Sequence, residues 1–119
     1  MTTNDQDLTQ VSFHEATVVG LFRNGSTVTL TLDDVYIAGV QRPAKVVIEG
    51  VSVTLRDGSP VDGLHMEKED GEILTLRREG SEVKLAVEWN DFAAKSQETV
   101  VYSLLGQKIE MRIDPILEG

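Results

Sequence analysis

The sequence predicts an all-β protein, with a single antiparallel domain of about eight strands in a meander-type sandwich or a partly open barrel. Three observations predict this fold class. Apolar and polar residues alternate with a period of two, turn dipeptides such as Asn-Gly and Asp-Gly separate the alternating segments, and at most one short helical turn is suggested.

Residues 82–89 form the clearest strand, because their apolar side chains fall on alternate positions: Val83, Leu85, Val87 and Trp89. Trp89 is the single tryptophan of the chain. We expect it to anchor the core, so its replacement by alanine should cost about 3 to 5 kcal/mol of folding free energy.

Two earlier strands, residues 12–22 and 26–32, flank Asn24-Gly25, a strong hairpin signal because both residues accept positive φ. The apolar positions then change parity twice, at Asp33-Asp34 and at Glu49-Gly50. A change of parity indicates an inserted residue, so we expect a bulge or turn at the first position and a bulge at the second. A long strand bent there can pass from one sheet to another or curve a barrel wall.

Residues 57–60 and 62–63 carry dense turn signals. Residues 64–68 and 72–78 then predict a hairpin joined by Asp70-Gly71, with Leu64, Met66, Leu74 and Leu76 pointing inward. Charges at nearly every second position indicate that this hairpin lies at an exposed edge of the sheet.

Residues 90–97 form the longest polar connection in the second half of the chain. Phe92 to Lys95 are the only place where we expect a helical turn, capped by Asn90. Strands at residues 98–105 and 108–113 complete the sheet, and Asp114-Pro115 ends it.

A chain of 119 residues with 40% hydrophobic residues has the size of one domain. We expect a flexible tail at residues 1–10, an all-β domain at residues 11–114 and a C-terminal tail at residues 115–119. The absence of cysteine excludes disulfides, thiolate metal sites and cysteine nucleophiles. The polar, acidic start lacks a secretory signal and no apolar run is long enough to span a membrane, so a cytoplasmic location is expected.

The chain carries 20 acidic and 11 basic residues, which gives a formal net charge of −9. Such a surface repels nucleic acid and anionic membranes, so we expect neither as a partner. A basic protein partner fits this charge, although the same charge also serves solubility alone. The acidic residues that such a partner would meet are Glu67, Glu69, Asp70, Glu72 and Glu82.

The two histidines are the candidates for catalysis or metal binding. His65, Glu67 and Glu69 offer one imidazole and two carboxylates, but this spacing is common by chance and no further ligand is marked. His14 would face inward with Ala16, which favours packing at the core margin. No catalytic, phosphate-loop or dinucleotide motif occurs, so we assign no enzyme activity, metal or cofactor.

Four residues are candidates for a pocket: His14, Trp89, Phe92 and Tyr102. The three aromatic residues are expected near one hairpin end, where aromatic side chains can line the mouth of a ligand site. The alternative is that they complete the core of a small β domain.

Phe13-His14-Glu15-Ala16, followed by a valine-rich strand, a hairpin turn and a Thr-Leu-Thr-Leu run, resembles the opening of small bacterial all-β proteins with an apolar-His-Asp-Ala/Ser motif. These include uncharacterised families and immunity proteins of polymorphic toxin systems. Their later strands often carry a tryptophan, as Trp89 does here, whereas Glu15 stands where aspartate is typical. The resemblance spans residues 13–113 and implies binding rather than catalysis, and an acidic domain would suit a basic toxin.

Three functions are compatible with these patterns. The first is a non-enzymatic protein-binding module, either of the immunity type or self-associating. The second is a small-molecule carrier whose sheets curve around an apolar cavity. The third is a metal-dependent enzyme using His14 or His65, which requires carboxylates to converge on a histidine in space.

Overall fold

The computed structural model describes residues 11–13 and 15–116, and it confirms the predicted all-β fold class in a single compact domain. Ten strands are present in this part of the chain: β1 (Val11–Ser12), β2 (Thr17–Asn24), β3 (Thr27–Ile37), β4 (Val40–Glu49), β5 (Val53–Arg56), β6 (Ser59–Val61), β7 (Asp70–Glu79), β8 (Glu82–Asp91), β9 (Ser96–Leu105) and β10 (Glu110–Pro115). β1 has two residues and β6 has three. The other eight strands have four residues or more, in line with the predicted number of about eight.

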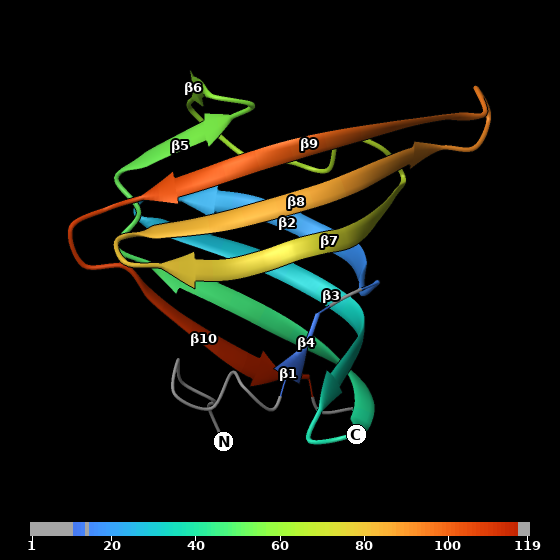
Figure 1. Cartoon of the computed structure of the whole chain (residues 1–119), viewed down its shortest axis with the longest axis horizontal. Helices are drawn as coiled ribbons and strands as arrows, with labels where there is room; N and C mark the ends of the chain where they lie inside the picture. Colours follow the sequence, from blue (N-terminus) through green and yellow to red (C-terminus); the bar gives the residue numbers. More distant parts are fainter. Residues whose placement is uncertain (1–10, 14, 117–119) are drawn as a thin grey trace.

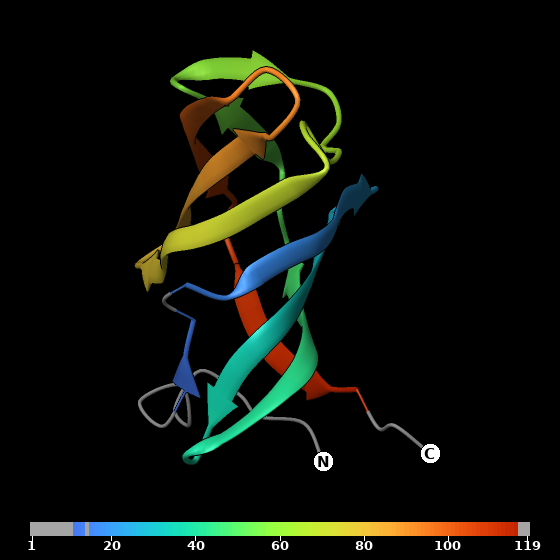
Figure 2. The ribbon, with the colours of Figure 1, turned by 90° about the vertical axis from the view of Figure 1, so that its right-hand side faces the viewer.

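All strands belong to one antiparallel sheet in the order β10-β4-β3-β2-β7-β8-β9-β5-β6, with β1 paired to β3. The sheet does not close into a barrel. It bends so that β10-β4-β3-β2 forms one layer and β7-β8-β9-β5-β6 forms another that lies across it (Figure 1, Figure 2). β2 and β7 join the layers through only two residue pairs, Thr17 with Glu72 and Val18 with Gly71. The result is a sandwich that is open along most of the β2–β7 seam.

The connections β4–β5 and β9–β10 also join the two layers, and they pack against each other at what we call the linker end, residues 50–52 and 106–109. Residues 50–52 form a break between β4 and β5 rather than the predicted bulge, but the predicted passage from one layer to the other is confirmed, because β4 belongs to one layer and β5 to the other. Gly50 has a φ of 82°, and a Cβ atom there would collide with the carbonyl oxygen of Lys108. A Cβ atom on Gly106 would likewise collide with the carbonyl oxygen of Gly50. The backbones therefore approach more closely than any side chain allows.

The parity change at Asp33-Asp34 is a β-bulge, where the pairing of β3 with β4 shifts between Leu32 and Val35. Asp34 has a φ of 61°, the left-handed conformation that aspartate tolerates better than most residues. The bulge restores the inward direction of the apolar side chains after two charged residues, so Val35 is buried like Leu32.

The core lies between the two layers, and its largest fully buried side chains include Trp89 and Tyr102. Trp89 is 1% exposed and confirms the prediction of a core anchor. Its ring lies over Gly71 on β7, where an added Cβ atom would be 2.7 Å from Cζ3 of the indole. A glycine opposite the tryptophan therefore makes room for the ring.

The predicted charged edge hairpin is wrong. Residues 62–69 form a loop rather than a strand, and Asp70-Gly71 begins β7, which lies between β2 and β8 in the middle of the sheet. The Asp-Gly signal was misleading because Gly71 serves the packing of Trp89 instead of a turn. Leu74, expected to point inward, is 36% exposed because β7 carries a bulge between Ile73 and Thr75.

The helical turn considered at Phe92 to Lys95 is a hairpin turn between β8 and β9. Its cap comes from Asp91 rather than Asn90, since the Ala94 N–H donates to Asp91 Oδ1 at 3.1 Å. At the C-terminus, β10 runs to Pro115, and the Ile116 N–H donates to the Pro43 carbonyl oxygen at 3.0 Å. The tail predicted at residues 1–10 and the last residues of the tail predicted at 115–119 lie outside the described residues.

Candidate functional site

The hairpin β8–β9 extends past its neighbours and forms an arm at the end of the molecule opposite the linkers (Figure 1). β7 begins at Asp70, opposite Asn90, so Asp91, the last residue of β8, has no partner on β7. We call residues 91–96 the arm tip. Phe92, at this tip, is 70% exposed, more than any other large apolar side chain in the described part of the chain. The arm therefore presents an aromatic ring to solvent at a defined point.

The base of the arm is held in place by side chains that point to opposite faces of β8. Trp89 points into the core over Gly71, while Asn90 points to the other face and donates to Asp70 Oδ2 at 2.8 Å. Asn90 is itself buried, so this side-chain bond links β7 and β8 where β7 begins. The exposed tip is thus carried on a well-packed strand pair rather than on a long loop.

The loop of residues 62–69 is held beneath the arm by a network centred on Glu67. Arg56 donates from Nε to Glu67 Oε2 at 2.9 Å and from Nη2 to Oε1 at 2.6 Å, which is a bidentate pair. The Tyr102 hydroxyl donates to the same carboxylate, and Trp89 Nε1 donates to the Tyr102 oxygen at 3.1 Å. The network satisfies the polar atoms of two buried aromatic side chains and ties the loop to β5, β8 and β9.

The network fixes the protonation states of its members. Hydrogen bonds from Arg56 lower the pKa of Glu67, although burial opposes this shift. Burial raises the pKa of Tyr102, and its hydrogen bond to Glu67 adds to the shift. Glu67 is therefore ionised and Tyr102 neutral around pH 7, which suits a structural clamp better than general acid–base catalysis.

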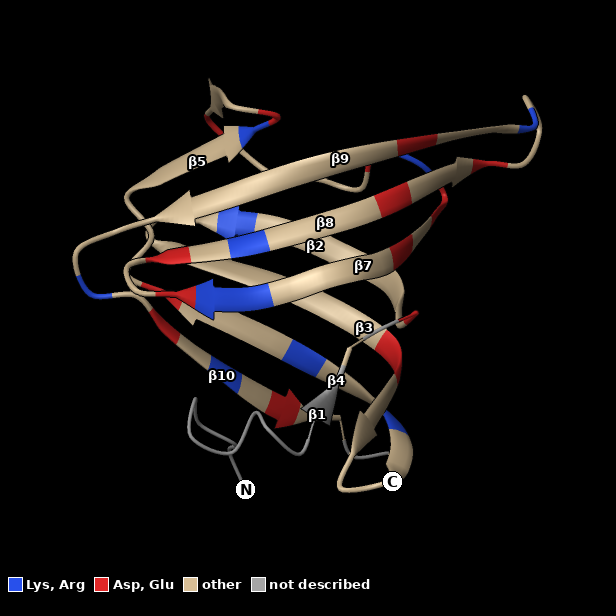
Figure 3. Ribbon diagram, in the orientation of Figure 1, with Lys and Arg blue, Asp and Glu red and all other residues tan. Residues whose placement is uncertain are grey.

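Carboxylates gather around the arm, where Figure 3 shows acidic segments of β7, β8 and β9 and a basic segment at the arm tip, while the other ends of β7 and β8 carry both acidic and basic segments. Glu72 on β7 lies directly opposite Glu88 on β8. Glu98 on β9 lies opposite Trp89, and its carboxylate is 3.3 Å from Arg56 Nη2. Two like charges held directly opposite each other on neighbouring strands destabilise a sheet.

A hollow of about 210 Å³ lies at the base of the arm tip and is lined by Lys68, Glu69, Asn90, Asp91, Phe92 and Ala93. Lys68 Nζ is 3.8 Å from Asp91 Oδ2, a partly exposed ion pair. This hollow combines an exposed aromatic ring with acidic side chains, the combination that binds lysine or arginine side chains.

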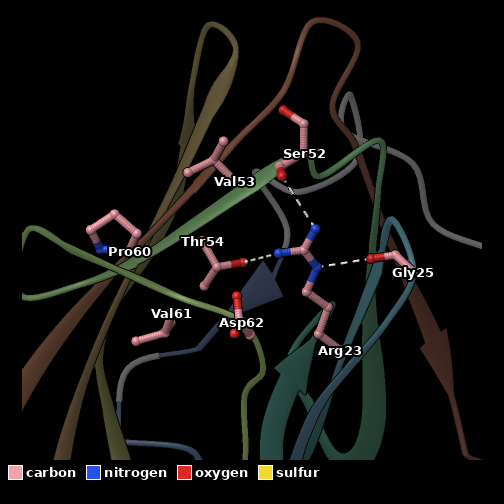
Figure 4. Close-up of a pocket in the computed structure, with 8 residues that line it drawn as sticks. All are labelled: Arg23, Gly25, Ser52, Val53, Thr54, Pro60, Val61 and Asp62. Atoms are coloured by element: carbon pink, nitrogen blue, oxygen red, sulfur yellow. Dashed lines mark hydrogen bonds between the residues drawn. The ribbon is translucent and has the colours of Figure 1, made fainter.

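A larger hollow of about 420 Å³ lies at the linker end and is lined by Arg23, Gly25, Ser52, Val53, Thr54, Pro60, Val61 and Asp62 (Figure 4). Arg23 donates to the Gly25 carbonyl oxygen at 2.8 Å, to Thr54 Oγ1 at 3.1 Å and to the Ser52 carbonyl oxygen at 3.3 Å. Most of its donors are thus used to hold the β2–β3 turn against β5. We interpret this hollow as a joint between the layers rather than as an anion site.

The structure brings together four of the five predicted acidic residues at the arm end: Glu67, Glu69, Asp70 and Glu72. Two of these carboxylates are already bound, Glu67 by Arg56 and Asp70 by Asn90. Glu82 begins β8, six residues before Glu88, which is about 20 Å away at a strand rise of about 3.3 Å per residue. The predicted acidic surface is therefore not one continuous patch.

Among the predicted pocket residues, Trp89 and Tyr102 are brought together, but they are buried and bonded to each other. Phe92 lies outside the core, and His14 lies outside the described residues. His65 is exposed, and the described ranges contain no group of three or more His, Asp or Glu side chains that could hold a metal ion.

Several residues of the site were missed from the sequence. Arg56 and Glu67 are 11 positions apart across an irregular loop, so no local pattern links them. The sequence predicts a turn at Gly71, whereas in the structure this glycine lies in β7 opposite Trp89. A glycine on a strand that neighbours the strand of the single tryptophan was a usable signal. The polar run Ser96-Gln97-Glu98-Thr99, whose residues are all exposed at the start of β9, was the available signal for an open strand edge.

No protein-family model, curated protein or solved structure matches the chain. The resemblance to small bacterial all-β proteins therefore stays a prediction. The described residues include no helix, and so none that could cross a membrane.

Proposed function

We propose that this protein is a non-catalytic module that binds a basic protein through the arm end. The observation that carries the proposal is the arm tip, where Phe92 is 70% exposed at the end of a well-packed hairpin and shares a hollow with Glu69 and Asp91. Aromatic anchors dominate the binding energy of many protein interfaces, and a rigid hairpin holds this one in a defined position.

The charge around Phe92 specifies the kind of partner. Glu72 and Glu88 face each other across β7 and β8. Of the two lysines at the arm end, Lys68 is paired with Asp91, and Lys95 lies in the arm tip itself, so the carboxylates around the arm outnumber the lysines. A lysine or arginine from a partner would relieve the repulsion between the two carboxylates. The net charge of −9 would also accelerate the approach of such a partner at low ionic strength.

The immunity-type function implied by the resemblance is one form of this proposal, because an acidic immunity protein neutralises a basic toxin by contact. Self-association is a weaker form, since two chains of net charge −9 repel each other. The carrier alternative draws no support from a sheet that stays open and fills its inner face with Trp89, Tyr102 and Leu30.

The proposal is tested by capture of proteins from a native lysate on the immobilised chain, followed by identification of the bound proteins and calorimetry with each purified one. We expect basic proteins, an affinity that falls as salt rises, and at least tenfold weaker binding by Phe92→Ala. Phe22→Ala is the matched control, because Phe22 is 50% exposed but lies on β2 of the other layer. The proposal fails if no basic protein is captured, or if binding is insensitive to salt and equal in the two variants.

A further inference from the structure

We infer that the basic partner binds as an added β-strand along the open edge of β9, an inference that rests on the proposed function. β5 pairs only with the last residues of β9, from Tyr102 to Leu105. Residues 96–100 pair with β8 on one side and, among the described residues, with no strand on the other. Figure 1 shows this half of β9 running beyond β5 toward the arm tip.

The direction of the backbone groups on this edge follows from the hydrogen bonds beside it. Asp57 donates its N–H to the Val101 carbonyl oxygen at 2.8 Å, and Asp57 Oδ1 accepts the Val101 N–H at 2.8 Å. The N–H and C=O of Val101 therefore point away from β8. Because these groups alternate along an antiparallel strand, the N–H and C=O of Gln97 and Thr99 point the same way. Beyond Asp57, the two N–H and two C=O groups of Gln97 and Thr99 are therefore placed to hydrogen-bond an added strand.

Two other open edges of the sheet, those of β7 and β10, are protected. On β7, the residues beyond the contact with β2 contain a bulge after Ile73 and an ion pair of 2.8 Å between Arg77 and Glu79. On β10, Arg112 is paired with Glu49 and Asp114, and a proline ends the strand. Bulges, prolines and edge charges are the usual devices against strand addition.

The open edge of β9 has fewer of these devices. β9 pairs with β8 in an unbroken register from Ser96 to Leu105, without a bulge or a proline. Its one charged side chain between residues 96 and 101 is Glu98, in the centre of the open segment. An added strand can therefore extend this edge over about five residues or about 17 Å.

Glu98 decides which strand can be added. Its carboxylate projects on the same face as Trp89, its cross-strand neighbour, and Glu88 lies beside Thr99 on the opposite face. Arg56 Nη2 lies 3.3 Å from the Glu98 carboxylate but also binds Glu67, so the two carboxylates and one guanidinium keep a net negative charge. A strand that carries lysine or arginine at alternate positions would place positive charges beside Glu98, whereas an acidic strand would be repelled. The occupant is therefore an extended basic segment of a partner protein.

A second copy of the chain is the competing occupant. In the two-fold arrangement that pairs Gln97 of one copy with Thr99 of the other, the two Glu98 side chains lie directly opposite each other, which is unfavourable. The net charge of −9 on each chain adds to the repulsion. Glu98 thus works against self-pairing and in favour of a basic strand.

The first test uses a defined probe, the peptide acetyl-Lys-Val-Lys-Val-Lys-Val-Lys-amide, and the full chain. We expect saturable binding, with slower hydrogen exchange of the Gln97 and Thr99 amides in the complex. Thr99→Pro should weaken binding at least tenfold, because proline removes an N–H that points to the open edge. Thr99→Ala keeps that N–H and should bind within about twofold of the unchanged chain.

A second probe tests the inference without relying on the folding of a variant. Two further peptides carry N-methyl groups on alternate backbone nitrogens, one on the odd and one on the even positions. Methylation removes the N–H donors that strand addition needs and leaves the charge unchanged, so at least one of the two peptides should lose binding. The inference is overturned if Thr99→Pro and both methylated peptides bind like their parents. It is also overturned if the unchanged chain alone forms a dimer in sedimentation that Thr99→Pro abolishes, since the occupant is then a second copy.

The two proposals can fail separately. If captured basic proteins lose affinity for Phe92→Ala but not for Thr99→Pro, the protein-binding function stands and strand addition is wrong. If captured proteins are indifferent to both changes, the proposed function itself is wrong.

Discussion

At the linker end, the backbone of residues 50–52 packs directly against the backbone of residues 106–109, whereas at the arm end the loop of residues 62–69 is held by side chains around Glu67. The first contact depends on two glycines and contains no titratable group among its closest atoms. The second depends on a carboxylate, a guanidinium and a hydroxyl. Substitution should therefore be least tolerated at the linker end, while pH should act at the arm end.

The comparison also locates the binding surface. At the linker end, the Val51 N–H donates to the Ser26 carbonyl oxygen at 2.9 Å and the Ser52 N–H donates to the Leu105 carbonyl oxygen at 2.7 Å, so the edge beside β5 is used internally. At the arm end, the same side of β9 is left open. Backbone groups on this side of β9 hold the layers together at the linker end, whereas at the arm end the corresponding groups remain available to a partner.

The largest effect is expected from Gly50→Ala. The change places a Cβ atom against the Lys108 carbonyl oxygen at a φ of 82°, so we expect a loss of about 3 kcal/mol or more of unfolding free energy. Gly25→Ala is the matched control, because Gly25 also has positive φ, 61°, but no atom within 4 Å of an added Cβ. It should cost about 1 kcal/mol in urea denaturation. Equal losses would show that the close backbone packing contributes nothing.

The next effect concerns Gly71, at the base of the arm. In Gly71→Ala the new methyl group would lie 2.7 Å and 2.8 Å from two ring atoms of Trp89, which should cost about 1 to 3 kcal/mol of stability. Trp89→Phe removes part of the ring, so the double variant should lose less than the sum of the two single losses. Strict additivity in a double-mutant cycle, measured by denaturant unfolding, would contradict this packing.

The smallest effect is expected from Glu67→Gln. Arg56 is partly exposed and screened by water, so we expect a loss of about 1 to 2 kcal/mol at pH 7. Because the folded state lowers the pKa of Glu67 below its usual 4.5, this carboxylate stabilises the fold above pH 4.5, and the contribution is lost as pH falls through the folded pKa.

Unfolding free energy measured against pH should therefore fall less steeply below pH 4.5 in Glu67→Gln than in the unchanged chain. Tyr102→Phe is the companion variant, since it removes one hydrogen bond to Glu67 but keeps Arg56, and should cost about 1 kcal/mol. Parallel acid profiles of the unchanged chain and Glu67→Gln would rule out Glu67 as the group that responds to acid.

Local patterns predicted the strands well where one face is buried. The alternation in β8 and the parity changes at Asp33-Asp34 and Glu49-Gly50 were sufficient to place a core strand, a bulge and a passage between layers. They failed at residues 64–71, where alternating charge and an Asp-Gly pair predicted an edge hairpin. There the decisive contact is between Gly71 and Trp89, which are 18 positions apart, and a local pattern does not record it.

The candidate site was predicted only in part. Glu69, Glu72 and Phe92 were named from charge and aromatic content, and they do lie at one end of the molecule. Trp89 and Tyr102 were named together and are in contact, but inside the core. The polar run of residues 96–99 was a signal for an open edge, but the sequence does not show that β5 ends at Arg56 and pairs with the far half of β9, and this pairing is what leaves the edge open.

The sequence by itself determined the all-β class, the single domain, the acidic surface and the buried tryptophan, because these follow from composition and from the period of two along each strand. Tertiary structure alone decided which strands are neighbours, which carboxylates are bound and which strand edge is left open. The physical reason is that pairing and burial depend on contacts between distant segments, such as Arg56 with Glu67 and Gly50 with Lys108. No local run of residues encodes these contacts.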